Sequence, residues 1–190
     1  MSRLLACSFA AIVLIATQVA AAGEGLARAM DAMRQGNWAA ADIAARADGQ
    51  IARDVIAWHK LRAGQGTASE AMAFLDRHPD WPGLPYLREK SEVAMGEASP
   101  AEVRAFFADD LPQTGAGALA LADALSRAGE EGAAQATVVL AWRTLSMSSD
   151  EHRALRDRWG DILRPHHVAR LDMALWKGWR SNAAAMVSRA

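Results

Sequence analysis

Signals that begin and end helices recur along this chain about every 15 or 16 residues, a spacing that suits short helices and little else. The most specific are capping boxes, in which a Ser or Thr and a Glu three residues later satisfy each other's backbone N–H groups. They are Thr67 with Glu70, Ser99 with Glu102, and Ser148 with Glu151. Pro85, Pro100 and Pro165 suit a first helical position, and Gly36, Gly64, Gly96, Gly129 and Gly178 suit a left-handed helix end.

These signals predict an all-α fold of about eleven short helices, and no segment has a convincing strand pattern. We expect the helices to begin near residues 24, 38, 53, 69, 85, 100, 116, 131, 149, 165 and 180. Two successive helices make a unit of about 31 residues, so the expected architecture is an α-solenoid or superhelix of stacked helical hairpins. The expected apolar stripes include Ile51, Val55, Trp58 and Leu61 in one helix, and Ala134, Val138, Ala141, Trp142 and Leu145 in another.

The stretch FLDRHPDWPGLPYLREK, residues 74–90, interrupts this pattern with three prolines. Proline lacks an N–H and pushes the preceding residue out of the helical region, so the three cannot share one helix. We predict that FLDRH ends a helix, that PDWPGL is a turn, and that Pro85 begins the next helix. His78, Pro79, Trp81 and Pro82 then form a structural joint without a ligand, and Trp81 covers the joint between successive helix pairs.

The first 22 residues have the three parts of a secretory signal peptide. Arg3 precedes a short apolar run, and three alanines ending at Ala22 form a small-residue cleavage pattern. We expect cleavage after Ala22 and export to the periplasm, which leaves residues 23–190 as the scaffold domain. Cys7 would suit a lipoprotein acylation box, but the apolar core continues past it, so we expect no stable membrane anchor.

Charge and motifs exclude several kinds of function. The formal net charge is -1, and Lys and Arg are scattered singly, so nucleic-acid binding is not expected. His166 and His167 are adjacent and point about 100° apart on a helix, which does not suit one metal ion. The acid pairs Asp109-Asp110 and Glu130-Glu131 lie at expected helix boundaries, where acids favour the helix dipole or water. The sequence therefore predicts no catalytic residue, no cofactor site and no metal site.

Seven tryptophans are the most unusual feature of the composition, because exposed ones can stack on sugar rings. We expect Trp58, Trp142 and Trp176 to pack in the core because they lie on apolar stripes. Trp38, Trp159 and Trp179 lie at expected turns.

An ordered series of motifs runs through the chain: GNW, then DVIAWHKLRAG, then EAMAFLDRHPDWPGLPYLREKSEVAM, and later ARLDMALW. The series resembles the amino-terminal superhelical region of periplasmic soluble lytic murein transglycosylases of the alphaproteobacterial type. The residues that carry the resemblance are Asp54, Trp58, Leu61, Phe74, Leu75, His78, Pro79, Trp81, Pro82, Ala169, Arg170, Leu171, Asp172, Leu175 and Trp176.

The resemblance implies a ring-shaped or U-shaped helical scaffold, and peptidoglycan as the substrate of the parent enzyme. In that family a glutamate in a separate lysozyme-like domain cleaves the bond between N-acetylmuramic acid and N-acetylglucosamine, leaving a 1,6-anhydro product. This chain has no Glu-Ser dipeptide and no A-Y-N-A-G segment, so no catalytic residue carries over. We expect it to be non-catalytic, with peptidoglycan and the catalytic domain of the parent enzyme as its partners. It stops inside a helical pattern, so we expect the scaffold domain to be incomplete at its C-terminal end.

Two alternatives remain open. GNWAAADIAARA resembles the turn of tetratricopeptide repeats, so the chain would suit a stand-alone periplasmic adapter that binds a protein or peptide. A self-sufficient enzyme of an unrelated class is disfavoured by the lack of a recognisable site.

Overall fold

The structure is a computed structural model that describes residues 23–187, and every regular element in that range is a helix. The prediction of an all-α fold is therefore confirmed for the described part of the chain. The expected signal peptide, with its cleavage site at Ala22, lies outside the described residues. The chain divides into two compact units between Gln65 and Gly66.

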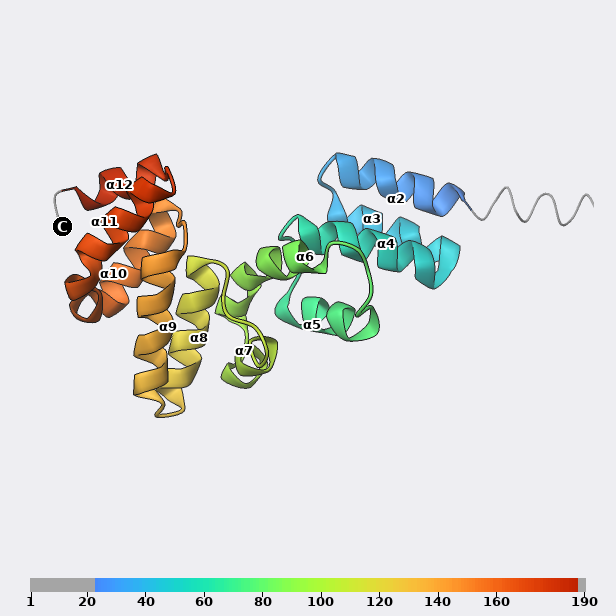
Figure 1. The fold of residues 1–190 in the computed structure, drawn as a ribbon. Helices are drawn as coiled ribbons and strands as arrows, with labels where there is room; N and C mark the ends of the chain where they lie inside the picture. Colours follow the sequence, from blue (N-terminus) through green and yellow to red (C-terminus); the bar gives the residue numbers. More distant parts are fainter. Residues whose placement is uncertain (1–22, 188–190) are drawn as a thin grey trace, which may run out of the picture. The chain divides into compact units, whose positions relative to one another are not determined.

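Alanine forms most of the core of the first unit. Its elements are α2 (Glu24–Arg34), α3 (Trp38–Ala45), the 3-10 helix η1 (Arg46–Asp48) and α4 (Gly49–Arg62) (Figure 1). The buried core residues are Ala29, Ala41, Ala45, Ala52 and Ile56. Because alanine projects only a methyl group, helices with alanine at their contacts approach closely. Asp48 also joins two elements here, since its carboxylate accepts from the Leu26 backbone N–H at 2.6 Å.

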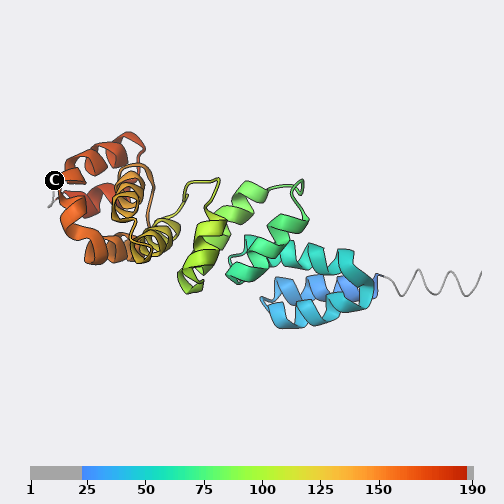
Figure 2. The same ribbon diagram turned by 90° about the horizontal axis from the view of Figure 1, so that it is seen from below.

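The second unit holds the remaining helices. They are α5 (Ala68–Arg77), α6 (Leu84–Ser91), η2 (Glu92–Glu97), α7 (Pro100–Phe106), α8 (Gly115–Arg127), α9 (Glu131–Thr144), α10 (Ser149–Leu163), η3 (Arg164–His166), α11 (His167–Trp176) and α12 (Arg180–Met186). Helices α8 and α9 lie side by side as a hairpin in both ribbon views (Figures 1 and 2). The largest core cluster of this unit surrounds the fully buried Trp142 and includes Val138, Leu155 and Leu163.

Most of the predicted start and end signals of the helices are present in the structure. All three predicted capping boxes form, with both of their reciprocal hydrogen bonds. Positive φ angles at Gly36, Gly64, Gly129 and Gly178 confirm four of the five predicted helix-ending glycines. The fifth prediction was wrong, because Gly96 lies within η2 and has no positive φ.

Helix starts differ from expectation in a few places. Helix α4 begins at Gly49 rather than near residue 53, because Gly49 adopts a φ of 83° and separates α4 from η1. Leu84 precedes Pro85 as the first residue of α6, and Pro165 lies in η3 rather than beginning an α-helix. The three 3-10 segments also make the number of helical elements in the described residues differ from the expected eleven.

One of the two predicted apolar stripes is confirmed only in part: Leu61 is buried, and Val55 and Trp58 are half-buried. Ile51 is 78% exposed, whereas Ile56, which the stripe omitted, is fully buried. A stripe can be drawn through either residue because α4 carries apolar side chains on several faces. The second stripe is confirmed at Ala134, Val138, Ala141 and Trp142, all of which are buried.

Candidate functional site

The predicted joint is built around an aromatic cluster. The ring of Phe74, in the last turn of α5, is fully buried and stacks on Trp81, with centroids 5.1 Å apart. His78 contacts both rings, at 4.7 Å from Phe74 and 4.3 Å from Trp81. Pro79 and Pro82 lie in the connection around this cluster, between α5 and α6. Trp81 therefore packs on the helix that precedes it, which directs the chain into α6.

Glu92 has the electrostatic character of a general acid, because burial raises the pKa of its carboxyl group. Hydrogen bonds oppose that shift: the carboxylate accepts from the backbone N–H of Gln113 and Thr114, both at 2.8 Å, and from the Thr114 hydroxyl at 2.6 Å. The nearby charge of Arg88 opposes it too. Only 1% of Glu92 is exposed, so a substrate has no access to it. Its role is to hold the loop before α8 against η2.

Arg170, one of the residues that carry the family resemblance, is also buried, with 2% exposed. Its guanidinium donates to the carbonyl oxygens of Trp142 and Leu145 at the end of α9, and to Asn182 Oδ1 at 2.7 Å. Desolvation lowers the pKa of Arg170 to about 10, so the side chain is still charged at neutral pH. Asn182 in turn bonds both the N–H and the carbonyl of Met147. This network ties α9, α11 and α12 together.

The three tryptophans expected in the core differ in how far they are buried. Trp142 is fully buried, as predicted. Trp58 is only partly buried, with the Arg62 guanidinium 4.4 Å from its ring centroid. The prediction for Trp176 was wrong: it is 85% exposed, because it ends α11 on the side away from the buried Arg170 and Ala174. Trp159, expected at a turn, lies inside α10 at a kink, with φ of -128°.

The acid pairs singled out from the sequence take part in surface contacts. Asp110 pairs with Arg88 at 3.0 Å, and Glu130 pairs with Arg104. Glu131, in the first turn of α9, accepts from the Ser126 hydroxyl. Within residues 23–187, His, Cys, Asp and Glu form no group of three or more that could hold a metal ion. No described helix has the length and apolar character that crossing a lipid bilayer requires.

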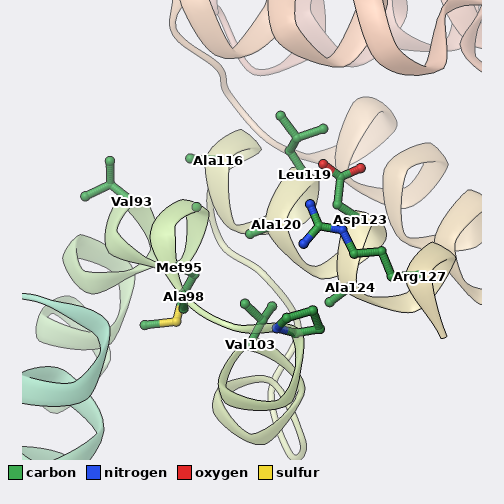
Figure 3. Close-up of a pocket in the computed structure, with 12 residues that line it drawn as sticks. Val93, Met95, Ala98, Val103, Ala116, Leu119, Ala120, Asp123, Ala124 and Arg127 are labelled. Atoms are coloured by element: carbon green, nitrogen blue, oxygen red, sulfur yellow. The ribbon is translucent and has the colours of Figure 1, made fainter.

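Among the cavities of the second unit, one is mainly apolar and another is lined by arginines. The apolar cavity, about 230 Å³ in volume, lies between η2, α7 and α8 and is lined mainly by aliphatic side chains (Figure 3). Figure 3 shows Asp123 and Arg127 of α8 beside each other at one edge, with Val93, Met95 and Val103 on the facing elements. Asp123 also accepts from Arg158 at 3.2 Å. This cavity therefore has one ion-paired acid and no acid–base pair.

The second cavity, which we call the arginine cavity, has a volume of about 390 Å³. It lies between the start of α10 and α12, and none of the described residues that line it carries a carboxylate. Its lining residues are Met147, Ser148, Ser149, His152, Arg153, Arg156, Ser181, Asn182 and Ala185. The arrangement offers cationic and hydroxyl groups for binding and no paired acid for glycosidic chemistry.

The sequence did not point to Glu92, Arg156 or Asn182. Glu92 meets partners 21 and 22 residues away, and Asn182 meets a partner 35 residues away, so no local spacing marks either residue. Arg156 could have been found only by noting that it follows Ser149, His152 and Arg153 on one face of a helix.

Comparison of the chain with protein-family models, with curated proteins and with solved structures found no match.

Proposed function

We propose that this chain is the periplasmic scaffold region of a lytic murein transglycosylase, that its hairpins stack into an α-solenoid, and that it is not itself catalytic. In this proposal it presents peptidoglycan strands to a catalytic domain of the parent enzyme. The signal-like first 22 residues support export. The chemistry of the parent enzyme is the non-hydrolytic cleavage described above.

The observation that carries the proposal is the structural position of the motif residues. Phe74 is fully buried against Trp81 and His78 where α5 ends, and Arg170 bonds the final carbonyls of α9. Asp54 is also buried and accepts from Gln50 at 2.8 Å. Residues that make the joints of helices are the ones that a helical scaffold family has most reason to share.

Trp176 supports contact with glycan. Its indole is 85% exposed at the end of α11, and an exposed indole offers a flat apolar face on which a sugar ring can stack. The adjacent Leu175 is 63% exposed, which widens the apolar surface. A glycan strand with its sugar faces against Trp176 is the contact that this geometry favours.

A stand-alone adapter is the second candidate. The turn glycines Gly36 and Gly178 have φ angles of 73° and 70°, and each is followed one or two residues later by a tryptophan. Each glycine lies between paired helices, α2 with α3 and α11 with α12. Such recurring hairpins are also typical of tetratricopeptide adapters, which bind peptides in a groove.

Co-sedimentation with purified peptidoglycan sacculi tests the proposal. We expect the chain to sediment with sacculi, Trp176→Ala to lose most of that binding, and Ile51→Ala, which removes an exposed side chain of α4, to retain it. Release of anhydro-muropeptides by the chain alone would contradict its non-catalytic role. Absence of sedimentation, together with stoichiometric capture of a peptide, would favour the adapter.

A further inference from the structure

The arginine cavity is built from one face of a helix. Ser149, His152, Arg153 and Arg156 follow one another at positions i, i+3, i+4 and i+7 of α10, so they lie along the same side. Ser181, Asn182 and Ala185 of α12 form the opposite wall. The cavity therefore has a cationic wall on α10 and a wall of small polar residues on α12.

The wall on α12 is held firmly in place. Asn182 is 4% exposed, and its Oδ1 accepts from the Met147 N–H at 3.0 Å and from Arg170 at 2.7 Å. Its Nδ2 donates to the Met147 carbonyl at 3.0 Å. A wall fixed by buried hydrogen bonds presents its neighbouring groups in one geometry, as a preformed binding site requires.

The two arginines differ in their present contacts. Arg153 pairs with Asp150, whose side chain is 89% exposed, so a ligand can displace that pair at little cost. Arg156 makes no ion pair within residues 23–187, and its Nε is buried without a hydrogen-bond partner. No carboxylate of the described residues neutralises the charge of Arg156, so a ligand carboxylate that pairs with its guanidinium group displaces no existing ion pair.

The other residues that line the cavity indicate what kind of molecule would carry an anionic group to the two arginines. The hydroxyls of Ser149 and Ser181 make no hydrogen bond within the described residues, so they are available to peptide amide groups. Met147 and Ala185 add apolar surface. A cavity of about 390 Å³ is much larger than one carboxylate fills, which leaves room for the residues that carry it.

We propose that the arginine cavity binds the carboxylate of a short acidic peptide, with Arg156 as its main contact and Arg153 as the second. Guanidinium groups match carboxylates because both are planar and can form paired hydrogen bonds. The proposal rests on the cavity alone and would stand if the proposed function were wrong.

Isothermal calorimetry on the full chain at low salt tests this site. The probe is Ac-Ala-Glu-Ala with a free C-terminus, and its matched control is Ac-Ala-Gln-Ala-amide, which has no carboxylate. We expect binding of the acidic peptide, and at least about tenfold weaker binding of the control. Arg156→Met should weaken binding of the acidic peptide by a similar factor, whereas Arg164→Met, which removes an exposed arginine of η3, should leave it unchanged.

Arg156→Lys is a control for loss of folding. It keeps the positive charge and loses only the planar group that can form paired hydrogen bonds with a carboxylate. We expect it to bind with an intermediate affinity and to unfold at the same urea concentration as the parent chain. Equal binding of both peptides, or undiminished binding by Arg156→Met, would overturn the proposal. Absence of binding at millimolar peptide would do the same, and inorganic phosphate binding as tightly as the peptide would overturn peptide recognition.

Discussion

Gly117 gives the sharpest test of how the second unit is held together. A Cβ atom added at Gly117 would lie 2.2 Å from Glu92 Oε2 and 2.8 Å from its Cδ. Contacts that short force one group to move. The backbone of α8 is regular at this point, so the carboxylate of Glu92 has to leave its place.

The cost follows from the bonds that Glu92 would lose. Its carboxylate accepts hydrogen bonds from Gln113 and from both donors of Thr114, and bonds to a charged group contribute about 1.5–3 kcal/mol each. Loss of two of them costs about 3–6 kcal/mol. Alanine has a better helix propensity than glycine, which offsets at most about 1 kcal/mol of this loss. We therefore expect Gly117→Ala to destabilise the second unit by about 2–5 kcal/mol, a large part of the stability of a domain.

Urea denaturation of the full chain, followed by circular dichroism, measures this effect. The matched control is Gly132→Ala in the first turn of α9, where a Cβ atom meets nothing within 4 Å. We expect the control to be neutral or to stabilise by up to about 1 kcal/mol.

A double-mutant cycle identifies the cause. In a Glu92→Ala background the nearest remaining atom of residue 92 is its Cβ, at 3.1 Å, so adding Gly117→Ala should cost much less than it does in the parent chain. If Gly117→Ala stabilises the parent chain as Gly132→Ala does, or if its cost persists without Glu92, the reasoning is refuted.

Three further predictions concern the same unit. Arg170→Met should lower the free energy of unfolding in urea by about 2–4 kcal/mol, because it leaves buried acceptors without donors, whereas Arg164→Met, at an exposed ion pair, should change it by less than about 0.5 kcal/mol. Thr67→Ala should cost about 1 kcal/mol by loss of the capping box, whereas Thr137→Ala, inside α9, should not lower the thermal midpoint. Burial raises the pKa of Glu92 above 4.5, so the folded state holds this proton more tightly than the unfolded state. The stability that this provides is complete below pH 4.5 and is lost as pH rises through the folded pKa, so urea midpoints of the parent chain should fall over that range relative to those of Glu92→Gln.

Local signals explain why so many helix ends could be predicted. A capping box joins residues three apart, and a helix-ending glycine acts on its own backbone, so the sequence contains everything that these features need. Thr67, Ser99 and Ser148 form their predicted boxes for this reason. Gly49 shows the limit, since its positive φ ends η1 at a position with no capping box or proline beside it.

The candidate sites depended on contacts between distant residues. Arg153 and Arg156 lie on one helix face, which spacing alone implies, but the facing wall comes from Ser181 and Asn182. Only the packing of α12 brings that wall to α10. Likewise, the sequence marked Trp142 and Trp176 as equivalent core residues, and one is fully buried while the other is 85% exposed.

The amino-acid sequence by itself therefore determined the helical class of this protein, most of its helix boundaries and the turn at residues 78–82, because each depends on backbone geometry within a few residues. Tertiary structure decided which face of each helix is buried, which charges are enclosed and where cavities form. Glu92 and Arg170 are ordinary surface residue types, and they are buried here because backbone groups from distant segments satisfy them. Such partners are set by the packing of whole helices, since an apolar stripe has to pack against whichever neighbour the fold supplies.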